Sequence, residues 1–338
     1  MIRSRTALIC LVLLGGASGA WSAPAKMQAV VQTGDAAASF QTQTVDTPKP
    51  GAGQLLIQVH AAAVNPVDWK RKPAPITLPS GRVLPAIPGY DAAGVVDSVG
   101  SGVTAFKVGD AVVARVSGAF AQYVVADVDQ TVPKPKRFTF EQASGIPIAG
   151  MAGYGAAEAA NIKPGQRIAI IGAAGGAGSA AVDVVHAKGG KVIASGHSSQ
   201  ADWLKQQGVE EFVAYDKDDV PARIKGVDAV LNMVDGQAAP ALAYVKRGGM
   251  LTSIAGPPPA EQCAAAGVTC VQIRATAPGM TNGDTLRALV ALADAGKYTV
   301  RVTKVFPLVQ AAAAQQFAHA GDSVGKVILS VDPRSKDR

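Results

Sequence analysis

Cysteine and histidine are scarce in this sequence, because its 338 residues contain only three cysteines and four histidines. The histidines are not spaced with cysteines or carboxylates as a tetrahedral zinc site requires. The apolar run near the N-terminus is too short and too rich in glycine to span a membrane comfortably. Basic residues give a formal charge of +7, but they are scattered rather than arranged in stripes. These absences argue against catalytic zinc, a membrane span and nucleic-acid binding.

The N-terminal residues have the layout of a secretory leader. Arg3 and Arg5 precede an apolar run, and small residues follow it through Ala20. We therefore expect a signal peptide over residues 1–23 and a periplasmic or secreted protein. The alternative is translation from Met27, which would leave the protein in the cytoplasm.

Two cysteines remain once such a leader is removed, Cys263 and Cys270. They are close in sequence, and small residues between them would let a loop fold back. A local disulfide in an oxidising compartment and two free thiols are both compatible with this spacing.

The length and the 48% content of hydrophobic residues indicate a globular protein of two domains. Short alternating strands separated by Gly, Pro and Asp predict a barrel-like β domain up to about residue 147. Its strands are expected at residues 54–60, 94–100 and 111–114. After residue 150, alanine-rich helical segments alternate with apolar strands, including 228–232 and 249–255, which is typical of a doubly wound α/β domain.

A strand that runs into glycines is the most informative stretch. Residues 167–171 read as a buried strand, residues 172–178 (GAAGGAG) as a tight turn, and residues from Ser179 to about Lys188 as a helix. Glycine lets backbone amides approach phosphates, and the positive end of the helix dipole faces the anion. The strict G-x-G-x-x-G pattern is not met, because Ala173 stands first. The alternatives are a dinucleotide cradle and a structural turn without nucleotide.

A second strand at 190–195 ends in Gly196, His197, Ser198 and Ser199. A NAD site usually has an acidic residue there, which binds the ribose hydroxyls and repels a 2′-phosphate. Because these four residues include no carboxylate, the sequence favours NADP(H) over NAD. An ordinary polar loop is the alternative, since no Arg or Lys lies in this turn.

Several motifs together resemble one known family. They are VNPVDWK at 64–70, IPGYDAAGVV at 87–96, FKVGDAV at 106–112, AAGGAG at 173–178, VFPL at 305–308 and GKVIL at 325–329. In this order they are similar to the zinc-free quinone oxidoreductase branch of the medium-chain dehydrogenase/reductase superfamily. The resemblance implies a GroES-like β-barrel substrate domain (24–147 and 277–338), a Rossmann doubly wound parallel-sheet domain (148–276) and a homodimer.

The resemblance also implies a site between the two domains. Asn65 would face the nicotinamide and the substrate, Asp68 would brace that loop, and Tyr90 would donate to a developing oxyanion. The alternatives are a turn stabilised by side-chain-to-backbone hydrogen bonds for Asn65 and Asp68, and ordinary core for Tyr90. The expected cofactor contacts are Ala173, Ala174, Gly175, Gly176, Ala177, Gly178, Gly196, His197, Ser198, Ser199, Tyr215, Val234, Ile254, Ala255, Gly256 and Lys326.

Some residues depart from the family pattern. Zinc-dependent members have a cysteine ahead of the aspartate in the first motif and Gly-His-Glu in the second, whereas this chain has Asn65 and Val67 ahead of Asp68 and has Tyr90-Asp91 after Gly89. Ala152 replaces a threonine that helps to hold the nicotinamide, and Gln200 replaces a lysine found in some NADP-specific relatives.

Without a Lewis acid, reduction of a simple ketone is difficult, whereas a conjugated acceptor spreads the charge that hydride addition creates. The sequence therefore predicts a metal-independent, NADPH-dependent reductase of quinones or α,β-unsaturated carbonyls. A zinc-free alcohol or aldehyde dehydrogenase is one alternative. A catalytically silent protein that binds a nucleotide or a small ligand is the other.

Overall fold

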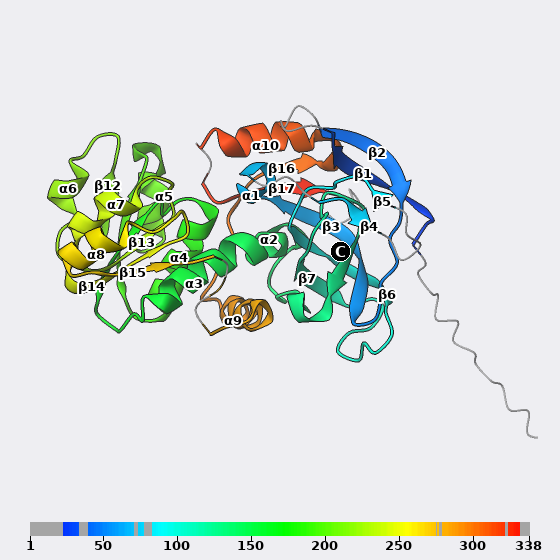
Figure 1. Cartoon of the computed structure of the whole chain (residues 1–338), viewed down its shortest axis with the longest axis horizontal. Coiled ribbons are helices and arrows are strands. Elements are labelled where there is room, and N and C mark those ends of the chain that lie inside the picture. The colour runs from blue at the N-terminus through cyan, green and yellow to red at the C-terminus, as the bar shows by residue number, and fades with distance from the viewer. Residues whose placement is uncertain are drawn as a thin grey trace, which may run out of the picture.

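The computed structural model describes residues 23–33, 40–70, 74–77, 83–274, 276, 279–321 and 324–331. The predicted leader lies outside the described residues, except for Ala23. Within the described residues the strands form two large sheets, one of six and one of seven strands, and two small sheets of two strands each. Figure 1 shows the six-stranded sheet with its helices at one end of the molecule and the seven-stranded sheet at the other.

The six-stranded sheet is parallel throughout, in the order β12-β11-β10-β13-β14-β15. Its central strand β10 is buried on both faces, and Ile168, Ala169 and Ile170 are all 0% exposed. The chain moves outward from β10 in one direction and then returns to β13 on its other side, which creates a switch point where such folds bind ligands. The strands are β10 (Arg167–Ile171), β11 (Lys191–Gly196), β12 (Glu211–Ala214), β13 (Val227–Asn232), β14 (Val245–Ser253) and β15 (Thr269–Gln272).

Helices cover this sheet, and the closest packing is between α3 and α4. A Cβ on Gly153 of α3 would lie 2.3 Å from the Ala177 carbonyl oxygen of α4, so glycine is needed for this contact. The helices of this half are α3 (Met151–Ala159), α4 (Gly176–Ala187), α5 (Ala201–Gln206), α6 (Val220–Arg223), α7 (Ala238–Ala241) and α8 (Ala260–Ala266), with the 3₁₀ turns η4 (Ser198–Gln200) and η5 (Leu242–Tyr244).

The seven-stranded sheet combines both ends of the chain. Strand β17 pairs antiparallel with β3, so that Val327 lies opposite Val64. Its order is β16-β17-β3-β6-β7-β9, and β8 pairs with β3. The strands are β3 (Gln54–Val64), β6 (Asp91–Val99), β7 (Ala111–Arg115), β8 (Tyr123–Asp127), β9 (Thr131–Pro133), β16 (Val302–Pro307) and β17 (Lys326–Ser330). The small sheets pair β1 (Lys26–Gln32) with β2 (Phe40–Asp46), and β4 (Ile76–Thr77) with β5 (Val83–Leu84).

Short helices pack around the seven-stranded sheet, which is called the barrel below, and join it to the parallel sheet. The π-helix η3 (Ile146–Gly150) follows α2 and leads directly into α3. The predicted domain boundary between 147 and 148 falls inside η3, and residue 277 lies outside the described residues, so both boundaries stay predictions. The remaining helices are α1 (Val67–Lys70), η2 (Val128–Gln130), α2 (Phe140–Ser144), α9 (Asn282–Asp294), η6 (Leu308–Gln310) and α10 (Ala311–His319).

The predicted fold class is confirmed, with differences at the ends of elements. The strand expected at 167–171 is β10, but the helix after it begins at Gly176 rather than Ser179. The reason is that Gly175 already caps this helix in an extended conformation, with φ −70° and ψ 170°. Strand β3 continues to Val64, beyond the expected residue 60, and β14 ends at Ser253, two residues before the expected 255.

Cys263 of α8 and Cys270 of β15 form a disulfide, with their Cα atoms 6.2 Å apart. This decides between the two alternatives that the sequence left open. Among the described residues, every helix is too short or too polar to cross a membrane.

Candidate active site

The glycine loop lies at the carboxyl end of β10, at the switch point of the parallel sheet. Gly172 has a φ of +79°, which only glycine adopts readily. A Cβ on Gly178 would lie 2.1 Å from the Gly172 carbonyl oxygen, so the first turn of α4 can pack against β10 only with glycine there. The first N–H groups of a helix have no acceptor within it. The loop therefore offers the backbone donors and the close approach that a pyrophosphate needs.

The C-terminal strand of the barrel reaches this loop directly. Gly325 donates its N–H to the carbonyl oxygen of Ala174 at 2.8 Å, and Gly175 and Gly325 form an isolated parallel bridge. A Cβ on Gly176 would lie 2.6 Å from Cδ of Lys326, so the lysine stem crosses the start of α4. Lys326 thus lies at the junction between the two halves of the molecule.

The next two strands end in loops that are tied to each other. Asn232, at the end of β13, donates its amide N–H to the Val234 carbonyl oxygen and to the Ser253 hydroxyl oxygen, each at 3.0 Å. Ser253, at the end of β14, in turn accepts the N–H of Ala255 at 3.2 Å. Asn232 and Ser253 are 0% exposed. Sequence reasoning named Val234, Ile254, Ala255 and Gly256 for this edge but missed the two buried side chains that hold their loops.

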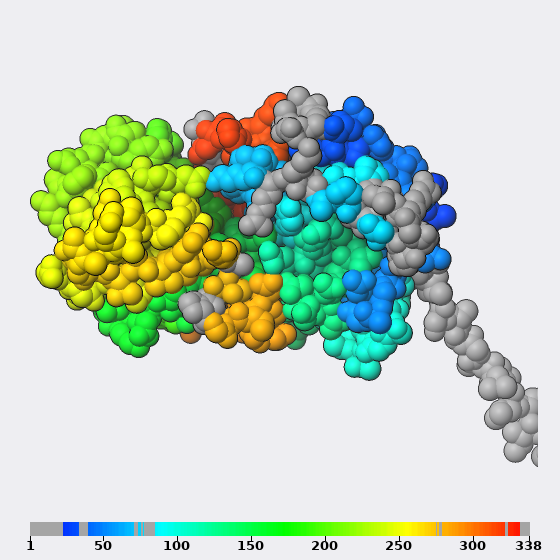
Figure 2. All heavy atoms as spheres, viewed as in Figure 1, coloured from blue at the N-terminus to red at the C-terminus, as the bar shows by residue number. Residues whose placement is uncertain are grey.

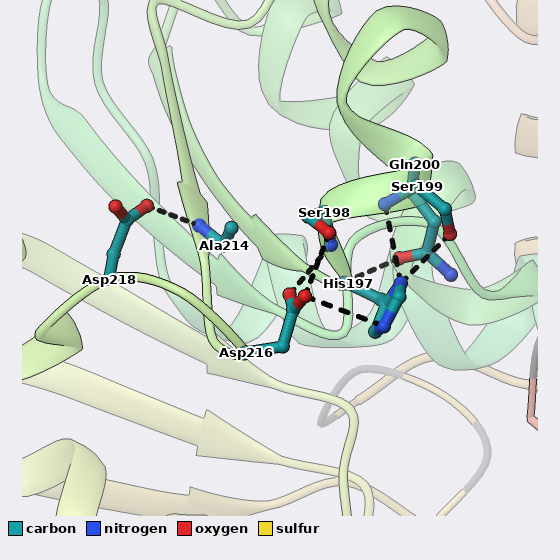
Figure 3. Close-up of polar contacts among 7 residues, drawn as sticks. All are labelled: His197, Ser198, Ser199, Gln200, Ala214, Asp216 and Asp218. Carbon is teal, nitrogen blue, oxygen red and sulfur yellow. Dashed lines mark hydrogen bonds and ion pairs between the residues drawn. The ribbon is translucent and has the colours of Figure 1, made fainter.

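The turn after β11 is a compact hydrogen-bonded unit (Figure 3). Gln200 accepts the N–H of His197 at 2.9 Å and is only 8% exposed, so its side chain is part of the turn. Ser199 donates its N–H to Nδ1 of His197 at 3.2 Å. The ring of Tyr215 lies 5.9 Å from the His197 ring, and Tyr215 is 60% exposed.

An acidic residue that the sequence argument missed closes this turn. Asp216 follows β12, the neighbouring strand, and accepts the N–H and the hydroxyl of Ser198, each at 2.7 Å. These hydrogen bonds, led by that of the Ser198 hydroxyl, lower the pKa of Asp216. The absence of a carboxylate among residues 196–199 is therefore offset by one supplied from the adjacent strand. The only signal in the sequence for this contact was that neighbouring parallel strands end at the same edge of a sheet.

A buried polar cluster lies where the barrel meets the parallel sheet. Lys326 donates to the Val64 carbonyl oxygen at 2.7 Å and to Oδ1 of Asn65 at 2.5 Å. The row of hydrogen bonds continues through Asn65, which donates its amide N–H to Asp91 at 2.8 Å. Asp91 also accepts the N–H of Ile148 in η3 at 2.9 Å. Asp68 accepts the backbone N–H of Asn65 at 2.7 Å.

The burial of this cluster decides its electrostatics. Asn65 and Asp68 are 1% exposed, Asp91 is 0% and Lys326 is 6%. Desolvation raises the pKa of both carboxyl groups and lowers the pKa of the Lys326 ammonium, while the opposite charges partly compensate. Oδ1 of Asp68 is buried without a hydrogen-bond partner among the described residues. Both N–H groups of the Asn65 side chain are used, towards Asp91 and the Ala63 carbonyl oxygen, so Asn65 has no free side-chain donor for a ligand.

The rim of the same junction is bridged by an exposed ion pair. Lys70 of α1 pairs with Asp235, which follows Val234 in the loop after β13. This contact brings the 65–70 segment of the barrel against the carboxyl edge of the parallel sheet. Trp69, next to Lys70, packs edge-on against His319 of α10, with ring centroids 5.4 Å apart. In Figure 2 the two lobes meet along this junction.

Tyr90 directly precedes Asp91 of the polar cluster. It lines a cavity of about 730 Å³ in the barrel, together with Arg115, Ser117 and Tyr123. The predicted roles of Asn65, Asp68 and Tyr90 stay predictions, but Asn65 and Asp68 are placed together in the cluster and Tyr90 lines this cavity.

Metal ligation finds little support in the donor set. Across the described residues, no three His, Cys, Asp or Glu side chains come together as metal ligands would. At the motif positions of zinc-dependent relatives, Asp68 and Asp91 accept backbone and amide N–H groups, and the ammonium of Lys326 lies beside them.

Comparison with known proteins places this geometry in a family. The family model for the alcohol dehydrogenase GroES-like domain matches residues 51–136, and that for zinc-binding dehydrogenases matches residues 207–329. A quinone-oxidoreductase QR1 (chloroplastic) of Triphysaria versicolor is 30% identical over 316 residues, which cover 88% of this chain and 95% of the relative. The chain belongs to the medium-chain dehydrogenase/reductase superfamily.

Further relatives place this dehydrogenase/reductase in the quinone oxidoreductase branch. An NADPH-dependent alkenal/one oxidoreductase (chloroplastic) of Arabidopsis thaliana is 30% identical over 295 residues, which cover 82% of this chain and 72% of the relative. The solved structure of the quinone oxidoreductase from Coxiella burnetii superposes with a TM-score of 0.78 at 26% identity, covering 91% of this chain and 100% of that one. The protein is an oxidoreductase that uses a pyridine nucleotide.

Proposed function

We propose that this oxidoreductase is a metal-independent reductase of quinones or α,β-unsaturated carbonyls that takes hydride from a reduced pyridine nucleotide. The observation that carries the proposal is the position of Lys326. Its stem crosses Gly176 of the glycine loop, and its ammonium anchors the buried polar cluster of the barrel. One side chain thus fixes the nucleotide cradle relative to the loop that faces it.

The residues of the parallel sheet fit a pyridine nucleotide. The glycine loop would hold the pyrophosphate, the turn after β11 the adenosine ribose, and the loops held by Asn232 and Ser253 the nicotinamide. When bound, such a cofactor supplies a hydride to an electron-poor carbon. The sequence favours NADPH, and the name of the Arabidopsis relative agrees with it. Gln200 and Asp216 weaken that preference, because one is committed to the turn and the other adds a negative charge.

The barrel residues would act mainly by orientation. The cluster of Asn65, Asp68, Asp91 and Lys326 holds the 65–70 segment rigid, so that an acceptor would be stacked in register rather than activated by a cation. The phenol of Tyr90 would donate to the oxygen on which charge develops, from the wall of the 730 Å³ cavity. Conjugated acceptors suit this arrangement because they spread the charge that a simple ketone would concentrate on one oxygen.

The test is a reductase assay of the purified protein. We expect NADPH or NADH oxidation with 1,4-benzoquinone and with 3-buten-2-one, at a rate that EDTA does not change and added zinc does not raise. Gly178→Val should abolish it, because the side chain would collide with the Gly172 carbonyl oxygen and displace the glycine loop. Activity confined to simple alcohols would favour the alcohol dehydrogenase alternative, and failure to bind either nucleotide would favour the silent binding protein.

Two finer properties belong to the same proposal. Export to the periplasm or the medium is supported by the leader-like N-terminus and by the Cys263–Cys270 disulfide, which is typical of oxidising compartments. A homodimer is supported by the edge position of β15, whose outer backbone groups are available for pairing. Thiol counting on protein from its native compartment and light scattering after gel filtration test these two properties.

A further inference from the structure

The turn after β11 contains an anion site that the chain fills with its own side chain. The N–H and the hydroxyl of Ser198 both point at Asp216, one at each carboxylate oxygen, and each hydrogen bond is 2.7 Å long (Figure 3). Paired backbone and hydroxyl donors at the start of a helical turn are typical phosphate ligands. In a dinucleotide-binding sheet, the end of the second strand is also where the adenosine ribose and any 2′-phosphate lie.

The groups around this site do not favour a phosphate. Nε2 of His197 is 3.5 Å from Asp216, and its Nδ1 already accepts the N–H of Ser199. Gln200 is turned into the loop and offers no cation. Asp218 adds a second carboxylate nearby, which accepts the N–H of Ala214 at 2.7 Å, and Lys217 lies exposed between the two aspartates. The hydrogen bonds from Ser198 keep Asp216 ionised by lowering its pKa.

We propose that Asp216 occupies the place of the cofactor's 2′-phosphate and makes this enzyme prefer NADH to NADPH. A ribose 2′-hydroxyl can donate to this carboxylate, which is the usual basis of NAD recognition. A 2′-phosphate would have to displace the carboxylate from Ser198 and would meet its negative charge. The inference rests on the proposed function, in that it assigns the nucleotide of the same site.

The experiment is a fluorescence titration of the full chain with NADH and NADPH in the absence of acceptor. We expect the Kd for NADPH to exceed that for NADH at least tenfold. Asp216→Ser should lower the Kd for NADPH at least tenfold and change the Kd for NADH by no more than about threefold. Asp216→Asn should lower the Kd for NADPH by a smaller factor. Asp218→Asn is the matched control, because it removes a neighbouring charge that does not contact Ser198 and keeps an acceptor for Ala214.

The outcomes separate the inference from the proposed function. If the wild type binds NADPH at least as tightly as NADH, or if Asp218→Asn changes the ratio as much as Asp216→Ser, Asp216 is not the determinant. If neither nucleotide binds, the proposed function itself fails. Loss of reductase activity with intact nucleotide binding leaves the inference standing. The ratio of the Kd for NADPH to the Kd for NADH should also fall below about pH 6, where a phosphate monoester takes up a proton.

A second, independent observation concerns Arg115, which lines the 730 Å³ cavity of the barrel. Its Nε is buried without a hydrogen-bond partner among the described residues. In the β6–β7 ladder it lies opposite Asp91, whose pKa it lowers without reaching ion-pair distance. A half-buried arginine with unused donors is suited to bind a carboxylate through two parallel hydrogen bonds.

The cavity wall also contains Tyr90, the proposed donor to the acceptor's oxygen, and the volume suits a small organic molecule. Ser117 and Tyr123 add hydroxyl groups, while Asp127, the one carboxylate among the described residues of the wall, accepts a hydrogen bond from Gln54 at 2.9 Å. We infer that the acceptor carries a carboxylate, which Arg115 binds while the conjugated carbonyl faces Tyr90. This inference also rests on the proposed function, because it names the class of acceptor.

A matched pair of acceptors tests it: (E)-4-oxopent-2-enoate and its methyl ester. Arg115→Gln should lower kcat/KM for the acid at least tenfold and leave that for the ester within twofold. Arg115→Lys, which keeps the charge near Asp91, should leave kcat/KM for the ester unaffected and lower kcat/KM for the acid by a smaller factor. Arg137→Gln, at an exposed arginine outside the cavity, should change neither. Equal losses for acid and ester would overturn the assignment.

A binding arm keeps this test independent of catalysis. Saturation-transfer NMR with 4-oxopentanoate, which lacks the reducible double bond, should detect binding to the wild type and not to Arg115→Gln. Binding that persists unchanged in the variant would overturn the carboxylate site. Failure of the wild type to reduce either acceptor, with selective binding of 4-oxopentanoate intact, would instead contradict the proposed function.

Discussion

The glycine loop and the buried polar cluster lie side by side, but they are encoded in opposite ways. The loop is one continuous stretch, and it works through its backbone, so glycine at Gly172 and Gly178 is almost all that it requires. The cluster joins Asn65, Asp91, Ile148 and Lys326, which are up to 261 positions apart, and it works through side chains. The comparison teaches that local backbone sites can be recognised in a sequence, whereas sites built from distant side chains can be recognised only in a fold.

The largest effect should come from removing the charge at the centre of the cluster. Lys326→Met keeps an apolar stem against Gly176 but leaves the Asn65 and Val64 oxygens without their donor and Asp91 without its counter-charge. We expect a loss of about 3–5 kcal/mol in the free energy of unfolding, measured by urea denaturation. Lys297→Met, at an exposed lysine, is the control. A loss below about 1 kcal/mol would mean that the cluster adds little to stability.

The glycine loop should be damaged by a single methyl group. Gly178→Ala places a Cβ 2.1 Å from the Gly172 carbonyl oxygen, and the backbone must shift. We expect a loss of about 1–3 kcal/mol of stability and a weakening of nucleotide binding by tenfold or more, measured by denaturation and by fluorescence titration. Gly175→Ala is the matched control for stability, since its Cβ would lie 3.6 Å from the same oxygen at an allowed φ of −70°. If both variants are equally unstable, close packing at Gly178 is not the cause.

Local features of this fold could be predicted from the sequence, whereas contacts between distant side chains could not. The strand at 167–171, the glycine loop and the barrel completed by β17 were all predicted, because they depend on local patterns or on an ordered set of motifs. Asp216 was missed because it follows β12 yet binds Ser198 after β11, so only strand adjacency brings the two together. Asn65 and Asp68 were singled out, but their partners Asp91 and Lys326 could not be paired with them before the chain was folded.

A buried carboxylate outside the cluster, Asp183, should also make stability depend on pH. Asp183 of α4 accepts the backbone N–H of Thr299 at 2.8 Å, and burial raises its pKa from 3.8 to about 6. The folded protein therefore binds a proton between pH 4 and 6 that the unfolded chain does not, so this group's contribution to stability falls as the pH rises through that range. Asp183→Asn should become more stable relative to the wild type from pH 4 to 6, by on the order of 1–3 kcal/mol, and the difference should stay constant above. A difference independent of pH, measured by thermal and urea unfolding, would contradict the shift.

The smallest effect should come from the exposed ion pair at the rim of the same junction. Lys70 and Asp235 are separated by 165 positions, as widely as many partners in the cluster, but their side chains are 52% and 65% exposed. Water screens such a pair and its formation costs side-chain entropy, so Lys70→Gln should lower the free energy of unfolding by no more than about 1 kcal/mol. That loss should disappear in 1 M NaCl, whereas the loss in Lys326→Met should persist, because buried charges are screened far less. A salt-insensitive loss of several kcal/mol at Lys70 would mean that distance in sequence, and not burial, sets the strength of the contacts that join the two halves of this enzyme.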